Sequence, residues 1–163
     1  MLLDAVIVHE IGHVLGIGTL WSNRGLLSDA GGGDPIFTGP TTLAQFLTLG
    51  GATYAGRPVP VENTGGAGTR DSHWRESVFR NELMTGFVNL GVNPLCRMTL
   101  GSLQDIGFTS VFFGAADSYS VPSSLLGFRD VGDGVSLEND IAPIPLDERI
   151  RAGLDRPGPL LRK

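Results

Sequence analysis

The sequence predicts an α+β fold in which a few short elements are joined by long irregular segments. Its 24 glycines and 10 prolines, in a chain of 163 residues, indicate many turns. One strongly apolar stretch, residues 2–15, predicts a helix that we expect to be buried, because it is apolar on nearly all sides. A chain of this length can form one domain with a hydrophobic core.

The first helix is expected to end at Gly16, since glycine is common just after the last helical turn. Residues 22–72 then form an irregular, glycine- and proline-rich insertion. One short helix, residues 42–49, is predicted inside the insertion, with Thr41 or Thr42 as its N-cap.

The remaining elements are short. Apolar residues on one side predict a helix over residues 99–106, with Gly107 as its stop. Residues 109–113 and 118–121 are predicted as strands. We therefore divide the chain into a domain over residues 1–142, whose C-terminal part is 73–142, and a proline-rich tail over 143–163.

Composition excludes several classes of function. The net charge is −5 and there is no block of basic residues, which argues against nucleic acid or an anionic membrane surface as the main partner. No apolar run is long enough for a membrane span. Cys96 is the only cysteine, so no disulfide can form within the chain, and we expect a buried thiol.

The chemistry is concentrated in the sequence His9-Glu10-Ile11-Gly12-His13, an H-E-x-x-H motif in the first helix. Two histidines four residues apart project from the same face of a helix and can bind one Zn²⁺ ion. The glutamate beside the first histidine is placed to act as the general base, so Glu10 is the predicted catalytic residue.

A third zinc ligand must come from elsewhere in the chain. In one metalloprotease pattern a histidine follows three residues after the glycine, but Thr19 occupies that position here, and a hydroxyl is not a usual zinc ligand. The candidates are the chain's third histidine, His73, and a carboxylate. The available carboxylates are Glu62, Asp71, Glu76 and Glu82.

Several further motifs resemble the leishmanolysin-type peptidases, which are metzincins with an insertion before the third zinc histidine. They are Gly16 without a histidine at Thr19, G-T-L-W at 18–21, S-H-W at 72–74, N-E-L-M at 81–84 and S-L-Q-D-I-G-F at 102–108. The similarity covers about residues 6–109 and is strongest to short, bacterial-type members.

The resemblance implies a zinc-dependent endopeptidase acting on proteins or peptides. It makes His9, His13 and His73 the ligands of one Zn²⁺ ion, and Met84 the methionine of the turn beneath the metal. It also implies a zincin-like catalytic domain and an extracellular or cell-surface setting. The chain contains no signal peptide or anchor motif, and its oligomeric state is not predicted.

Metzincin active-site helices pack against a sheet that precedes them, and only eight residues precede His9. We therefore expect a domain that lacks most of its N-terminal sheet subdomain, as part of a longer peptidase. Two alternatives remain open. One is a non-catalytic, zinc-stabilised binding module or inactive fragment, and the other is a zinc hydrolase with an acidic third ligand such as Glu82.

Two weaker features complete the prediction. Residues 130–140 are rich in acidic side chains and could bind Ca²⁺, but the spacing does not fit an EF-hand, so an acidic turn is the preferred reading. The charged pairs Arg70-Asp71 and Arg75-Glu76 flank His73. One of their carboxylates could orient the imidazole of His73, or these residues could form a solvated loop.

Overall fold

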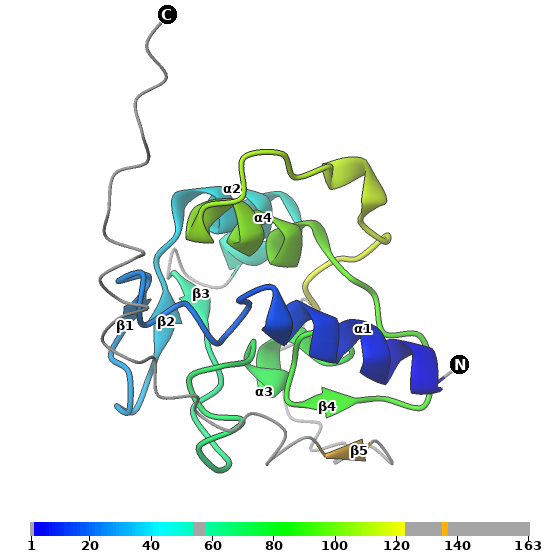
Figure 1. Ribbon diagram of the computed structural model, residues 1–163, viewed down its shortest axis with the longest axis horizontal. Helices are drawn as coiled ribbons and strands as arrows, with labels where there is room; N and C mark the ends of the chain where they lie inside the picture. The colour runs from blue at the N-terminus through cyan, green and yellow to red at the C-terminus, as the bar shows by residue number, and fades with distance from the viewer. Residues whose placement is uncertain (1, 54–57, 123–134, 137–163) are drawn as a thin grey trace, which may run out of the picture.

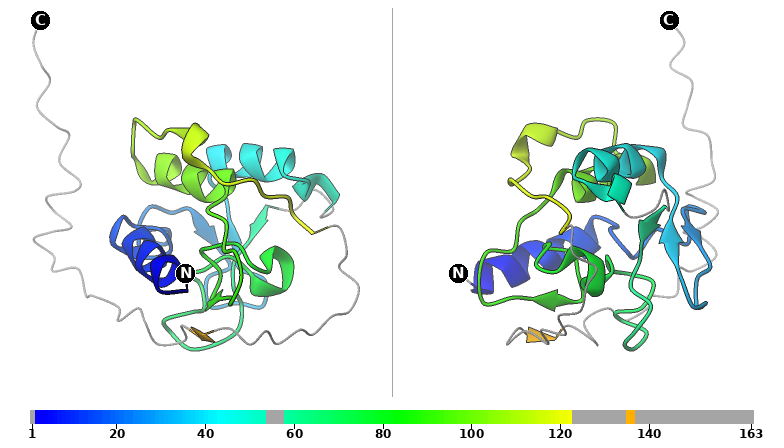
Figure 2. Two further views of the ribbon diagram at one scale, coloured as in Figure 1. Left: turned by 90° about the vertical axis from the view of Figure 1, so that its right-hand side faces the viewer. Right: turned by 180° about the vertical axis from the view of Figure 1, so that it is seen from behind.

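The computed structural model describes residues 2–53, 58–122 and 135–136 and has the mixed α+β character that the sequence predicts. Its helices are α1 (Leu2–Val14), α2 (Pro40–Thr48), α3 (Glu76–Phe79) and α4 (Arg97–Ile106), with short 3₁₀ turns η1 (Gly51–Thr53) and η2 (Phe113–Ala115). Helices α2 and α4 lie side by side in one layer, and α1 lies below this layer (Figures 1 and 2).

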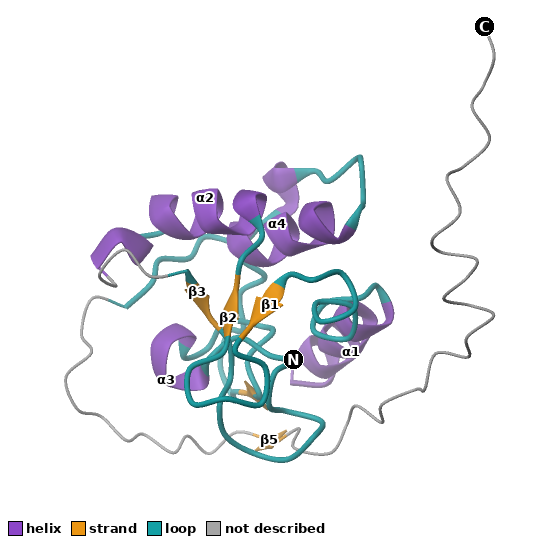
Figure 3. Cartoon of the chain, turned by 90° about the vertical axis from the view of Figure 1, so that its left-hand side faces the viewer, coloured by secondary structure: helices purple, strands orange, loops and turns teal. Residues whose placement is uncertain are grey.

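The insertion contributes the larger sheet, which has three antiparallel strands in the order β1-β2-β3 (Figure 3). The strands are β1 (Leu27–Ser28), β2 (Ile36–Phe37) and β3 (Val59–Pro60). Leu27 pairs with Phe37, and Ile36 pairs with Pro60. A second, two-stranded sheet joins β4 (Phe87–Val88) to β5 (Val135–Ser136).

Isolated bridges carry the pairing of the three-stranded sheet toward the segment that contains His73. Val61, directly after β3, forms an antiparallel bridge with Trp74, and Trp74 forms a parallel bridge with Thr85. The insertion is thus tied by main-chain pairing to the residue next to His73. It is less irregular than the sequence predicts.

Helix α2 confirms the predicted helix in the insertion but not its N-cap. The helix begins at Pro40, which suits the first helical position because its missing N–H needs no partner there. Thr41 and Thr42 therefore lie inside the first turn. Their N–H groups donate to the carboxylate of Asp105 on α4, at 3.0 and 2.8 Å, so α2 is capped from another helix.

Helix α4 confirms the predicted helix and its end. It begins two residues earlier than expected, and Gly107 follows it with a φ of +123°, a conformation that glycine adopts without strain. Gly101 allows α2 and α4 to approach closely, because a Cβ atom there would lie 3.1 Å from the Thr42 main chain.

Helix α1 is buried on one face only, whereas its apolar composition taken alone predicts burial on nearly all sides. Its buried residues are His9, Gly12 and His13. The opposite face is exposed and apolar: Leu3, Ile7, Val8, Ile11 and Val14, followed by Leu15, all lie at the surface. Val14 is 86% exposed. The helix thus turns its polar, histidine-bearing face toward the rest of the protein.

The hydrophobic core lies between the helix pair and the segments around His73. Trp21 and Trp74 are fully buried, with ring centroids 4.3 Å apart, and Phe37 lies 5.0 Å from Trp21. Further members are Ile17, Phe46, Val59, Val61, Val78, Phe79, Leu83, Met84, Cys96, Met98, Ile106 and Val121. The core therefore supports the residues next to His73. Cys96 is buried, as the sequence predicts.

The two predicted C-terminal strands are wrong. Residues 109–112 have no regular structure, residues 113–115 form η2, and residues 118–121 pair with no strand. Val121 makes one main-chain hydrogen bond, to the Leu49 carbonyl oxygen at 2.7 Å. A short apolar run forms a strand only where a partner edge is available, and none faces these residues in the described structure.

The predicted tail, residues 143–163, and nearly all of the acidic segment 130–140 lie outside the described residues. No described helix has the length and apolar character needed to cross a membrane.

Candidate metal centre

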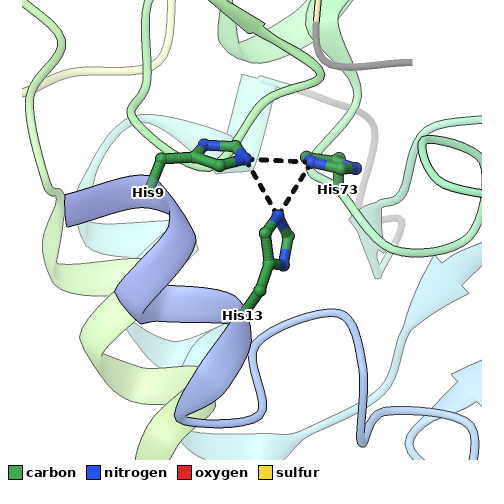
Figure 4. Close-up of side chains that lie close together, drawn as sticks. All are labelled: His9, His13 and His73. Carbon is green, nitrogen blue, oxygen red and sulfur yellow. Dashed lines mark hydrogen bonds between the residues drawn. The ribbon is translucent and has the colours of Figure 1, made fainter. Parts of the chain in front are cut away.

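Three histidines meet at one point on the buried face of α1. His9 and His13 extend from successive turns of the helix, and His73 enters from the segment after the insertion (Figure 4). His9 and His73 are fully buried, and His13 is 6% exposed. Their Nε2 atoms form a triangle with sides of 2.9, 3.0 and 3.1 Å.

The size of this triangle fits a metal ion. Nitrogen ligands about 2.0–2.1 Å from a tetrahedral zinc ion lie about 3.3 Å from one another. Within the described residues, these three histidines form the group of possible ligands that could hold a metal. The structure therefore joins residues that are 60 and 64 positions apart in the sequence.

The other ring nitrogen of each histidine faces a main-chain carbonyl oxygen. His9 Nδ1 lies 2.7 Å from Leu83 O, and His13 Nδ1 lies 2.9 Å from Ile17 O. His73 Nδ1 lies 3.0 Å from Thr69 O and 3.2 Å from the hydroxyl of Ser72. These contacts fix the orientation of each imidazole ring.

The carbonyl partners also decide the tautomer of each imidazole. A carbonyl oxygen only accepts, so each neutral ring carries its proton on Nδ1 and keeps a lone pair on Nε2. The dashed contacts in Figure 4 then join three lone pairs. Lone pairs repel one another unless a cation lies between them, so the donor set fits a divalent metal.

Glu10, the predicted base, and Met84, the predicted turn methionine, lie on α1 and in a turn beside it. Glu10 follows His9 on α1 and is partly exposed. Met84 is 1% exposed and lies in a turn packed against the helix, because a Cβ atom on Gly12 would come within 2.7 Å of the Met84 sulfur. The Met84 side chain therefore packs against α1 at Gly12, which lies between the two histidines in sequence.

Gly16 ends the helix as predicted, with a φ of +110°. Thr19, at the position where a shorter metalloprotease motif has its third histidine, donates its hydroxyl hydrogen to the His13 carbonyl oxygen at 2.9 Å. The hydroxyl thus satisfies a carbonyl group at the end of α1.

Glu82, the acidic candidate for the third ligand, lies apart from the histidine group. Its carboxylate is fully buried and accepts hydrogen bonds from Met84 N, Cys96 N and Thr99 Oγ1. Burial raises the pKa of the Glu82 carboxyl, and these three hydrogen bonds lower it.

The charged residues around His73 do not form a solvated loop. Arg75 is 8% exposed, and its guanidinium lies 2.6 Å from Asp34 and donates to the Val61 and Pro35 carbonyl oxygens. This side chain fastens the sheet of the insertion to the segment that follows His73. Asp71 accepts a hydrogen bond from Gly31 N, again within the insertion.

Sequence reasoning missed the main-chain atoms that orient the histidines, because a carbonyl group leaves no signal in the residue type. Glu62, one of the carboxylates considered as a ligand, is buried and has a structural role that sequence reasoning did not predict. The Glu62 carboxylate accepts from Glu76 N at the start of α3, and its own N–H donates to His73 O at 2.9 Å. The sequence shows only an acidic residue directly after Val61, and this does not reveal its burial.

A helix with an H-E-x-x-H motif, a remote third histidine and a methionine turn together define a metal site of the metalloprotease class. The leishmanolysin (peptidase M8) family model matches residues 2–122, and the chain belongs to this family. The family predicted from the sequence is thereby confirmed.

A leishmanolysin homolog from Crithidia fasciculata is 30% identical over 141 residues. The match covers 80% of this chain but 20% of the relative, so the chain spans about a fifth of the length of that curated protein. No solved structure matches the chain.

Proposed function

We propose that this protein is a zinc-dependent endopeptidase in which His9, His13 and His73 hold one Zn²⁺ ion. The observation that carries the proposal is the convergence of three buried Nε2 atoms whose rings are each fixed by a carbonyl oxygen. Neutral imidazole nitrogen is a preferred zinc ligand, and three protein ligands leave one position open for water or substrate.

When bound, zinc would polarise the substrate carbonyl group and lower the pKa of water, so that a hydroxide nucleophile is available near neutral pH. Glu10 has the role of general base. Its carboxylate accepts a proton from the attacking water and then donates this proton to the nitrogen of the leaving amine. The side chain follows His9 directly on α1, which holds it next to the ligand group.

The acidic-ligand alternative is less well supported. The Glu82 carboxylate is already bonded to three donors from the Met84 turn and the start of α4. Binding a metal would require breaking these buried hydrogen bonds, and each unsatisfied donor costs about 1–3 kcal/mol.

The substrates we propose are proteins or peptides, and we place the activity outside the cell or at its surface, as the resemblance to leishmanolysin-type peptidases implies. Both statements extend from the family to this chain. The experiment below tests the substrate class.

The test combines metal content with cleavage of casein. We expect the purified 163-residue chain to contain about one zinc ion and to lose cleavage when a chelator removes it. Glu10→Gln should retain zinc but lose at least about 10²-fold in rate. Asp4→Asn, an exposed acidic residue on the same helix, is the matched control and should cleave at the wild-type rate.

A wild-type rate for Glu10→Gln would contradict the assigned base. Zinc binding without any cleavage by the wild-type chain would favour a non-catalytic, zinc-stabilised module instead.

A further inference from the structure

Glu82 joins the turn beneath the metal centre to the first turn of α4. One carboxylate oxygen accepts from Met84 N at 2.7 Å, and the other accepts from Cys96 N at 3.2 Å and from the Thr99 hydroxyl. Glu82 and Thr99 are both fully buried. A buried carboxyl group needs hydrogen-bond partners in place of water, and three donors face this one.

The directions of two hydrogen bonds in this network, from Trp74 to Thr99 and from Thr99 to Glu82, can be assigned. Trp74 Nε1 is a donor only, and it donates to Thr99 Oγ1 at 2.8 Å. The hydroxyl of Thr99 therefore directs its own hydrogen to Glu82. The chain of donors runs from Trp74 through Thr99 to Glu82, and the carboxylate is the acceptor at its end.

Both ends of this network adjoin a histidine of the metal centre. Leu83 lies between Glu82 and Met84, and its carbonyl oxygen orients the ring of His9. Trp74 follows His73, and its main-chain N–H donates to Met84 O at 2.9 Å. A shift of the Glu82 carboxylate therefore moves the carbonyl group behind His9 and the residue after His73 together.

We infer that Glu82 and Thr99 are positioning residues that hold His9 and His73 at the separation required for metal binding. Neither side chain touches the metal or the substrate. This inference rests on the zinc site proposed above. Glu82 then has a structural role instead of the metal-ligand role that the sequence left open. The first turn of α4 also becomes part of the structure that supports the metal centre.

Thr99→Val tests the inference because valine has the same shape but no hydroxyl. The change leaves Trp74 Nε1 without its acceptor and removes one donor from Glu82. We expect zinc affinity to fall at least about tenfold, as for other residues that orient metal ligands. Affinity is measured by competition with a chromophoric chelator. The absorption spectrum of the Co²⁺-substituted protein should also change, because it reports ligand geometry.

Thr42→Val is the matched control. Thr42 is also fully buried, and its hydroxyl donates to a carboxylate, that of Asp105, at 2.7 Å. Its loss should lower the melting temperature without changing the Co²⁺ spectrum, and zinc affinity should stay within about twofold. Thr99→Ser, which retains the hydroxyl, should have the zinc affinity and the Co²⁺ spectrum of the wild-type protein.

The inference is overturned if Thr99→Val lowers the melting temperature like Thr42→Val and leaves zinc affinity and the Co²⁺ spectrum unchanged. If Thr99→Val does not fold, the inference is tested instead by titrating the wild-type protein with zinc and recording its NMR spectra. Coupling is reciprocal, so zinc should shift the amide resonance of Cys96 but not that of Thr42. An unmoved Cys96 resonance refutes it. A wild-type chain that binds no zinc refutes the proposed function as well.

Discussion

Gly18 packs against the main chain of Ser72 so closely that no larger residue fits. A Cβ atom at Gly18 would overlap the Ser72 carbonyl oxygen and lie 2.8 Å from its carbonyl carbon. Gly18 also has a φ of +74°. The turn after α1 is therefore fitted against the residue that precedes His73, and this contact holds the third histidine near the helix.

Gly18→Ala should be far more destabilising than Gly25→Ala. Both glycines have a positive φ, at +74° and +67°, but a Cβ atom at Gly25 meets nothing within 4 Å. Gly25→Ala should cost only the strain of the backbone conformation, about 1–2 kcal/mol of unfolding free energy. Gly18→Ala adds a steric overlap with main-chain atoms. Urea unfolding measures the difference, and equal losses would contradict the close packing.

Metal removal should destabilise the protein. A ligand that binds only the folded state adds about 2.7 kcal/mol to the unfolding free energy when its free concentration is 100 times its dissociation constant. We expect the melting temperature to fall after chelation and to recover when zinc is returned. His13→Ala serves as the control, since zinc should no longer stabilise that variant. A melting temperature unaffected by chelator would argue against a buried zinc site.

His73→Ala should lose zinc at equimolar metal because it removes one of three converging nitrogen ligands. The two remaining histidines on α1 can still bind zinc weakly. Atomic absorption after gel filtration measures the stoichiometry. Retention of one full equivalent would instead support a carboxylate as the third ligand.

Glu76→Gln should stabilise the protein at high pH. Burial raises the pKa of the Glu76 carboxyl from 4.5 to about 7, with a smaller lowering by Thr85 and a further increase from Glu62. Its Oε2 atom is buried without a hydrogen-bond partner in the described structure. The folded state therefore holds this proton more tightly than the unfolded state, and ionisation destabilises the fold.

The wild type should lose stability relative to Glu76→Gln as the pH rises from about 4.5 to 7, and the difference should persist above pH 7. A shift of this size corresponds to about 3 kcal/mol for a fully buried carboxyl and to about half of that for one partly screened by water. Urea unfolding at pH 5 and pH 8 measures it. Parallel stability curves would contradict a buried, weakly solvated Glu76.

The sequence was sufficient to predict features set by local spacing. His9 and His13 share one face of a helix because α-helical geometry places residues four apart on the same face. Gly16 and Gly107 end their helices for an equally local reason. His73 and Met84 could be proposed only because the motifs around them resemble those of a known family.

The strands and the supports of the site were not predictable in this way. The two-residue strands of the insertion are too short to show alternation. Residues 109–113 and 118–121 have strand-like composition but pair with no strand among the described residues. Strand formation depends on a second segment distant in sequence.

The sequence by itself determined which side chains could bind a metal, because ligand chemistry belongs to the residue type. Only the tertiary structure brought His73 to His9 and His13, placed carbonyl groups behind all three rings, and turned Glu82 away from the centre toward Thr99. These relationships join segments far apart in the chain. They follow from packing and from the need of buried polar groups for partners, and both are properties of the folded chain as a whole.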